Sequence, residues 1–179
     1  MTSHDLSLAL RDADIVHDEA TLRAAIARIG AEITQALAGQ PAVFLTVMQG
    51  ALPFAGELAT RIDAPLLFDY VHASRFRGGT EGGELQWLRH PAVAMNGRTV
   101  LLVDDILDEG HTLKAIRDHV LAMGAARVLL VVLCEKRHGR TVPGLVADFC
   151  GVVVPDRYVF GYGMDFHEQG RNLPAIYAL

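Results

Sequence analysis

The stretch that decides the fold is VLLVDDILDEGHTL, from Val100 to Leu113. Its apolar start belongs to a strand that we expect over 99–105, because a short, continuous, β-branched run is typical of a strand covered on both faces. A helical pattern follows over 112–123, and the apolar run VLLVVL at 128–133 predicts the next strand. The order strand, helix, strand is typical of parallel strands joined by a right-handed crossover.

A comparable unit precedes this one in the chain. Apolar residues at helical spacing predict an amphipathic helix over 18–38, which ends at Gly39. The runs AVFLTV at 42–47 and LLFDYV at 66–71 predict two buried strands, with a helical segment at 53–62 between them. The two units together predict an α/β fold, a mostly parallel twisted sheet flanked by helices.

The composition favours a single globular domain and argues against several other classes of protein. A chain of 179 residues with 51% hydrophobic side chains predicts a single domain over 1–179. Sixteen Lys and Arg against 21 Asp and Glu give a net charge of −5, which argues against a nucleic-acid partner. No apolar run reaches the roughly 18 residues of a membrane span, so we expect no membrane partner. Two cysteines, Cys134 and Cys150, exclude a disulfide scaffold and favour a cytoplasmic location.

Two further segments carry no strong helical or strand pattern along their whole length. The polar stretch SRFRGGTEGGELQW at 74–87 is glycine-rich and long for a connection, so we expect a loop that is functional or disordered. The part from 148 to 179 predicts one strand, FCGVVV, and then an irregular region rich in Asp, Gly and aromatic residues.

An acidic turn follows the strand that opens the deciding stretch, at the edge where open α/β sheets bind ligands. One interpretation is that Asp108 or Thr112 only caps the next helix. The other is a phosphate site, because Gly110 allows the amides of 109–112 to converge at a helix N-terminus. Acids beside such a site could bind Mg²⁺ or sugar hydroxyls. The turn holds four carboxylates, those of Asp104, Asp105, Asp108 and Glu109.

The same stretch resembles the phosphoribosyl-pyrophosphate signature of the type I phosphoribosyltransferases: apolar strand, two acids, two apolar residues, Asp, one residue, Gly, one residue, Thr. The tail PDRYVFGYGMDFHEQGRNL at 155–173 is similar to the purine-binding hood of the hypoxanthine-guanine phosphoribosyltransferases, and the similarity extends over 43–179. The resemblance implies that family's fold, with a small hood over the site built from C-terminal and N-terminal parts, its C-terminal elements at about 148–179. It also implies Mg²⁺-dependent purine salvage, in which hypoxanthine or guanine and 5-phosphoribosyl 1-pyrophosphate give IMP or GMP and pyrophosphate.

The resemblance gives each residue of the acidic turn a role. Asp104 and Asp105 would contact the ribose hydroxyls or Mg²⁺. Asp108 would act as general base or acid at purine N7. The loop that holds the 5′-phosphate would consist of Asp108, Glu109, Gly110, His111 and Thr112.

The resemblance also assigns the residues that would hold pyrophosphate and the base. The turn 48–51, with Gln49 and Gly50, would contact pyrophosphate together with Arg171. Lys136 would recognise the purine 6-oxo group. The remaining purine contacts would be Tyr158 by stacking, Val159 through its backbone, and Asp165, which would also lie near Mg²⁺ with Asp104 and Asp105.

Three positions depart from the family pattern. Gln49 stands where many members have lysine, Glu109 stands where a small hydroxyl residue is usual, and Arg75-Phe76 replaces a Ser-Tyr pair in the loop that covers the site. An added carboxylate beside a phosphate is unfavourable, so we expect the Glu109 side chain to point away and only its amide to be used.

Two alternatives remain open from the sequence. One is a regulator that senses phosphoribosyl pyrophosphate and binds nucleic acid. The other is an enzyme of the same fold for another base, such as xanthine or adenine. The resemblance further implies a homodimer or homotetramer.

Overall fold

The computed structural model describes residues 5–75 and 85–179 of the chain. No helix in these two ranges is both long and apolar enough to cross a membrane. The helices are α1 (Leu6–Asp12), α2 (Glu19–Leu37), α3 (Leu52–Ala59) and α4 (His111–Ala122), and the strands are β1 (Asp14–His17), β2 (Ala42–Met48), β3 (Leu66–Arg75), β4 (Leu85–Arg89), β5 (Thr99–Leu107), β6 (Arg127–Lys136), β7 (Phe149–Val154), β8 (Val159–Phe160) and β9 (Ile176–Ala178).

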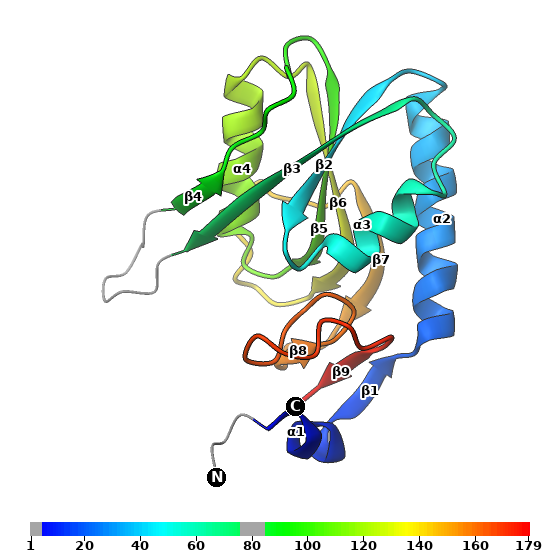
Figure 1. The fold of residues 1–179 in the computed structure, drawn as a ribbon, viewed down its shortest axis with the longest axis vertical. Coiled ribbons are helices and arrows are strands. Elements are labelled where there is room, and N and C mark those ends of the chain that lie inside the picture. The colour runs from blue at the N-terminus through cyan, green and yellow to red at the C-terminus, as the bar shows by residue number, and fades with distance from the viewer. Residues whose placement is uncertain (1–4, 76–84) are drawn as a thin grey trace.

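A six-stranded sheet in the order β4-β3-β2-β5-β6-β7 forms the body of the molecule (Figure 1). Every pairing in it is parallel except that of the edge strand β4 with β3. Since β5 pairs with β2 on one side and β6 on the other, the carboxyl ends of these three strands meet at one edge of the sheet. The mostly parallel α/β fold that the sequence predicts is confirmed.

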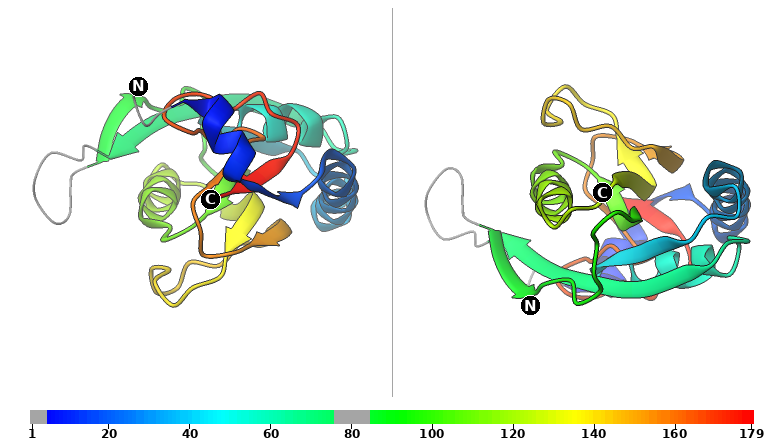
Figure 2. Two further views of the ribbon diagram at one scale, coloured as in Figure 1. Left: turned by 90° about the horizontal axis from the view of Figure 1, so that it is seen from below. Right: turned by 90° about the horizontal axis from the view of Figure 1, so that it is seen from above.

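Helices cover both faces of this sheet, with α2 and α4 on opposite sides (Figure 2). The predicted apolar stripe of α2, from Leu22 to Leu37, is buried in a core cluster shared with α3 and the strands. The apolar side of α4, with Leu113, Ile116 and Val120, is buried in a second cluster on the other face. Because both faces are covered, the central strands are apolar at nearly every position.

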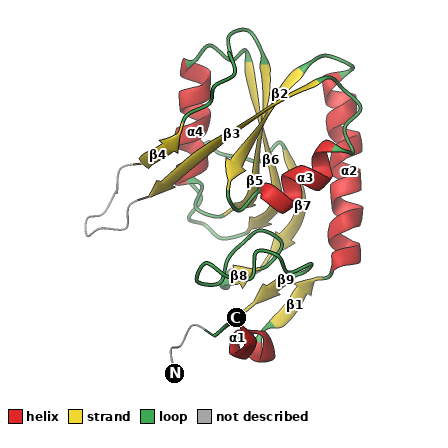
Figure 3. Ribbon diagram, in the orientation of Figure 1, coloured by secondary structure: helices red, strands yellow, loops and turns green. Residues whose placement is uncertain are grey.

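A smaller antiparallel sheet, β1-β9-β8, forms a hood below the carboxyl edge of the main sheet (Figure 3). It joins strands from the two ends of the chain, with Asp14 opposite Ala178 and Val159 also opposite Ala178. The predicted strand at 149–154 is present as β7, but it pairs with β6 in the main sheet. The hood therefore begins after Val154 and includes β1, so the expectation of a hood built from C-terminal and N-terminal parts is confirmed.

The polar segment after 71 is only partly a loop. Strand β3 continues to Arg75 and β4 begins at Leu85, and the two pair as an antiparallel hairpin with Arg75 opposite Leu85. The expectation of a loop over all of 74–87 is therefore wrong at both ends. Backbone pairing at an edge strand needs no apolar run, because one face of such a strand is open to water. Phe76 and the glycines at 78–83 lie outside the described residues.

Asp69 on β3 joins three segments at this side of the sheet. Its side chain is 3% exposed, and its Oδ1 accepts hydrogen bonds from Tyr70 N and Arg89 Nη1, both at 2.8 Å. Its Oδ2 accepts from Ala92 N at 2.6 Å and Val93 N at 2.9 Å. Burial alone would raise the pKa of Asp69, but these donors together hold it below its ordinary value.

Asp69→Asn should lower the free energy of unfolding by about 2 kcal/mol or more, because an amide group replaces one of two buried acceptors. A depressed pKa in the folded state stabilises the protein above the unfolded pKa of about 3.9, and that stability is lost as pH falls through the folded value. Urea unfolding between pH 7 and pH 3 measures both effects. The control is Asp63→Asn, at an exposed position, which should leave the curves unchanged; equal curves for the two variants would contradict the prediction.

Candidate functional site

The turn between β5 and α4 places main-chain amides at the edge of the sheet. Gly110 occupies the N-cap of α4 with φ +80°, a left-handed conformation that favours glycine. The N-cap makes no side-chain hydrogen bond, so neither Asp108 nor Thr112 caps the helix. The capping interpretation of the acidic turn is therefore wrong. The first amides of α4 are instead available to an anion, which the helix N-terminus favours.

Two adjacent carboxylates end the buried part of β5. Burial and, second, the charge of Asp105 raise the pKa of Asp104 well above its ordinary value. Burial also raises the pKa of Asp105, although the nearby Arg171 opposes this. Two acids held this close favour a cation beside them, because a cation would relieve their mutual repulsion.

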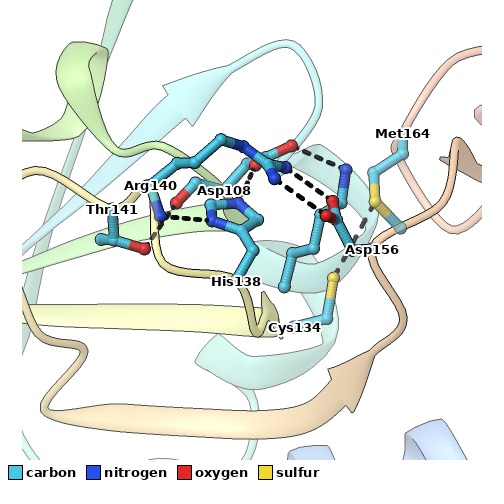
Figure 4. A network of polar contacts seen from close by, with 8 residues as sticks. Asp108, Cys134, His138, Arg140, Thr141, Asp156 and Met164 are labelled. Carbon is cyan, nitrogen blue, oxygen red and sulfur yellow. Dashed lines mark hydrogen bonds and ion pairs between the residues drawn. The ribbon is translucent and has the colours of Figure 1, made fainter.

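Asp108 lies between two donors, one at the end of β6 and the other in the loop that follows β6 (Figure 4). Lys136 Nζ donates to its Oδ2 at 2.7 Å, and His138 Nε2 lies 2.5 Å from its Oδ1. The side chains of Lys136 and His138 are only 12% and 3% exposed. Burial alone would raise the pKa of Asp108, but the hydrogen bonds from Lys136 and His138 bring it below its ordinary value.

The turn after β2 lies against both the acidic turn and the hood. It contains a cis peptide bond between Met48 and Gln49. A Cβ at Gly50 would stand 1.9 Å from Oδ2 of Asp105, and a Cβ at Gly163 would stand 1.9 Å from the carbonyl oxygen of Gly50. Glycine at both positions therefore allows the hood backbone, the turn and Asp105 to pack in direct contact.

Arg171 lies where the hood meets this corner, and its two hydrogen-bond partners belong to the hood. Its Nη1 donates to the carbonyl oxygen of Gly163 at 2.6 Å, and its Nη2 donates to Oδ1 of Asp165 at 2.7 Å. The other oxygen of Asp165 accepts from the amide of Glu168 at 2.9 Å. The arginine thus presents positive charge beside Gly50, where its Nη1 would lie 3.4 Å from an added Cβ.

Two cavities adjoin at the end of β5. The first has a volume of 560 Å³, and its lining includes every residue predicted to contact the purine. The second has a volume of 640 Å³, and its lining includes every residue predicted to contact phosphate, ribose or pyrophosphate. The two cavities share Asp105, Ile106, Asp108 and Asp165. The first is lined by Asp105, Ile106, Asp108, Lys136, Tyr158, Val159, Met164, Asp165 and His167.

The residues present suit Mg²⁺ only if the substrate supplies further ligands. Among residues 5–75 and 85–179, no group of three or more His, Cys, Asp or Glu side chains could hold a metal on its own. The expected set of Asp104, Asp105 and Asp165 therefore does not form such a group, since Asp165 already binds Arg171 and the Glu168 amide. Mg²⁺ often binds through one or two carboxylates plus phosphate oxygens and water, which fits the pair Asp104 and Asp105.

Two residues that depart from the family pattern, Gln49 and Glu109, both line the second cavity. The Glu109 side chain is 54% exposed, with its Oε2 3.7 Å from Nε2 of His111. His138 is not among the predicted site residues, although it stands two positions after Lys136 at the end of a strand, which is a signal in the sequence for a residue of this site.

Comparison with known proteins places these observations in a family. The sequence matches the phosphoribosyl transferase domain over residues 12–167. It is 36% identical to the hypoxanthine-guanine phosphoribosyltransferase of Streptococcus pneumoniae R6 over 163 residues, 90% of this chain and 89% of that one. This chain belongs to the phosphoribosyl transferase family. The family that the sequence resembles is thereby confirmed.

Other relatives agree with this assignment. The hypoxanthine-guanine phosphoribosyltransferase of Lactococcus lactis is 35% identical over 149 residues, 83% of this chain and 80% of that one. A crystal structure of a hypoxanthine phosphoribosyltransferase from Staphylococcus aureus superposes with a TM-score of 0.89 at 31% identity, covering 97% of this chain and 95% of that chain. The likeness therefore includes the hood as well as the main sheet.

Gly50→Ala should weaken nucleotide binding more than about tenfold, because the added methyl group must displace the Asp105 carboxylate from the second cavity. Calorimetric titration with GMP measures the affinity, and thermal unfolding checks the fold.

The matched control for this prediction is Gly56→Ala on α3, where an added Cβ meets no atom within 4 Å. We expect it to bind GMP as the unchanged chain does. Equal affinities for the two variants would contradict the close packing inferred around Gly50.

Proposed function

We propose that this protein is a purine-salvage enzyme that joins hypoxanthine or guanine to 5-phosphoribosyl 1-pyrophosphate and releases pyrophosphate. One observation carries the proposal: a cavity with base-binding groups and a cavity with phosphate-binding groups meet at Asp108. A substrate pair that fills both cavities would bring the purine nitrogen and the sugar carbon together there. The family membership and the names of the relatives support the same reaction.

In the first cavity the flat base would lie against the ring of Tyr158, which hydrogen-bonds through its hydroxyl to the carbonyl oxygen of Asp165 at 2.9 Å. Lys136 is the group suited to a 6-oxo acceptor, since its ammonium has three donors. When Lys136 turns from Asp108 to the base, that carboxylate loses one donor. Its basicity then rises, at the moment when a base is required.

The reaction forms a bond between purine N9 and the anomeric carbon while the bond from that carbon to pyrophosphate breaks. The electron pair of the broken bond leaves with pyrophosphate, and the proton on N7 passes to Asp108. Positive charge grows on the ribose and negative charge on the leaving group, so amides and cations should surround the phosphates. The amides of the 109–112 loop would hold the 5′-phosphate, and Gln49, Gly50 and Arg171 would hold the leaving group.

Mg²⁺ would be held by Asp104 and Asp105 together with substrate oxygens, and it would neutralise charge on the pyrophosphate. Asp165 would contribute to this corner by orienting Arg171. Where lysine is usual, Gln49 offers only an amide, so we expect more of the charge on pyrophosphate to be balanced by the metal and Arg171.

Asp108→Asn should lower kcat by about 10²-fold or more, because asparagine cannot accept the N7 proton. Spectrophotometric assay with hypoxanthine and guanine measures kcat, and titration with GMP checks that phosphate binding is retained. Unchanged turnover would remove Asp108 from this role.

A panel of bases tests the substrate class. Hypoxanthine, guanine, xanthine, adenine and uracil are each assayed with phosphoribosyl pyrophosphate and Mg²⁺. We expect turnover with 6-oxopurines and not with adenine, since an ammonium donor matches an oxo group and not an amino group. Turnover with none of them, together with salt-dependent binding of RNA or DNA, would favour a regulator that senses phosphoribosyl pyrophosphate and binds nucleic acid. Neither the net charge of −5 nor the relatives' names favour that alternative.

We also propose a cytoplasmic location, consistent with two cysteines, Cys134 and Cys150, that are both free. Burial raises the pKa of the Cys134 thiol well above its ordinary value, so the thiol stays neutral and packs as an apolar group.

A homodimer is the assembly that we propose. An apolar groove of 610 Å³ beside Met48 is lined by Phe44, Leu52, Phe68 and Tyr70. Phe68 is 62% exposed and Leu52 is 57% exposed, which is unusual for large apolar side chains gathered in one place. A second copy of the same face would cover them and support the pyrophosphate turn from behind.

Phe68→Glu should shift the protein from dimer to monomer, because it places a charge in the apolar contact. Light scattering after size exclusion measures the mass. The exposed Val146, far along the chain from the groove, provides the control Val146→Glu, which should keep the mass of the unchanged protein. A monomer before any substitution, or a dimer in Phe68→Glu, would argue against this face.

A further inference from the structure

His138 is a buried histidine beside the acidic turn, and none of the roles above uses it. Its side chain is 3% exposed and its Nε2 lies 2.5 Å from Oδ1 of Asp108. The other ring nitrogen, Nδ1, accepts a hydrogen bond from the backbone amide of Arg140 at 3.1 Å. Both nitrogens therefore have partners within the protein (Figure 4).

These two contacts determine which nitrogen of the neutral ring carries its proton. A backbone amide can only donate, so Nδ1 must carry a lone pair. The neutral ring then has its one proton on Nε2, where it is donated to Asp108. A doubly protonated ring would direct an N–H at the Arg140 amide, and a ring that gave up the Nε2 proton would become an anion. His138 is therefore a fixed donor and not a proton carrier.

The residues that follow His138 anchor its loop to two neighbouring segments, at Asp156 and at the acidic turn. Arg140 makes two hydrogen bonds to Asp156, at 2.9 and 2.7 Å. Thr141 Oγ1 donates to the backbone carbonyl oxygen of Asp108 at 3.2 Å. The amide of Val142 donates to the backbone carbonyl oxygen of Glu109 at 2.9 Å. The loop and the acidic turn thus move together, which keeps the ring at a constant position relative to the carboxylate.

We propose that His138 is a positioning residue that holds Oδ1 of Asp108 and so makes Oδ2 the atom that takes the purine proton. Lys136 shares Oδ2 before the base binds, and it can turn away to the 6-oxo group, whereas His138 is enclosed and cannot. One oxygen remains occupied throughout the reaction and the other becomes free when the base is in place. This inference rests on the proposed function, because it needs Asp108 as the proton acceptor.

The test compares two substitutions of His138 with different donors. His138→Gln keeps an N–H donor near the position of Nε2, and His138→Leu fills the space with no donor. We expect His138→Leu to lower kcat by about tenfold or more while the KM for phosphoribosyl pyrophosphate changes by less than about twofold, because only the proton transfer is affected. His138→Gln should recover most of the lost kcat.

The surface histidine His90 provides the control. It lines neither cavity, and His90→Gln and His90→Leu should both keep the kcat of the unchanged enzyme. Thermal unfolding of each variant separates loss of the fold from loss of the hydrogen bond.

A spectroscopic measurement tests the contact without any turnover. In protein labelled with ¹⁵N-histidine, the long-range ¹H–¹⁵N spectrum distinguishes the Nε2–H ring from the Nδ1–H ring. We expect the Nε2–H form for His138, and a change in its Nε2–H signal in Asp108→Asn. This measurement also serves if His138→Leu does not fold.

The outcomes separate this inference from the proposed function. If no purine base is turned over, the proposed function fails, and the spectrum alone still reports whether His138 donates to Asp108. If the enzyme is active, full kcat in His138→Leu overturns the positioning role. Equal losses in His138→Leu and His138→Gln, or an Nδ1–H ring, overturn it as well.

Discussion

The pairing of β5 between β2 and β6 is the constraint on which the rest of the structure depends. Because all three strands are parallel and in register, their carboxyl ends bring the turn 48–51, the acidic turn and Lys136 to one edge of the sheet. These groups are far apart in sequence and cannot meet in any other way. The apolar runs that bury the strands on both faces therefore also determine which polar residues can act together.

The hood supplies the part of the first cavity that the main sheet lacks. The sheet edge supplies charge and amides but no flat apolar surface, and the hood brings Tyr158 and Val159 over that edge. The close approach of Gly163 to Gly50 joins the two parts, together with a hydrogen bond from the Tyr162 hydroxyl to Glu57 on α3 at 2.7 Å. Both cavities are thus lined by residues of the main sheet together with residues of the hood.

The elements with strong apolar periodicity could be predicted from the sequence. The resemblance also pointed to the residues that line the two adjoining cavities. The stripe on α2 and the buried strands β2, β5 and β6 follow from apolar spacing alone. The hood strands β1, β8 and β9 are two to four residues long, and such short segments leave too little pattern to detect. The contact between Asp165 and Arg171 lies in an irregular part of the hood, where the sequence has no periodicity from which to predict it. His138 stands near Lys136 in the sequence, but its contact with Asp108 joins residues 30 positions apart and is made only in the fold.

The order of strands in the hood has a consequence for how the protein is made. β9 lies between β1 and β8, so the central strand of the hood sheet is Ile176–Ala178 and one of its edge strands is Asp14–His17. A ribosome synthesises the whole main sheet before β9 emerges. The nascent chain can therefore form the edge that carries the acidic turn early, while the hood is completed only after residues 176–178 have emerged.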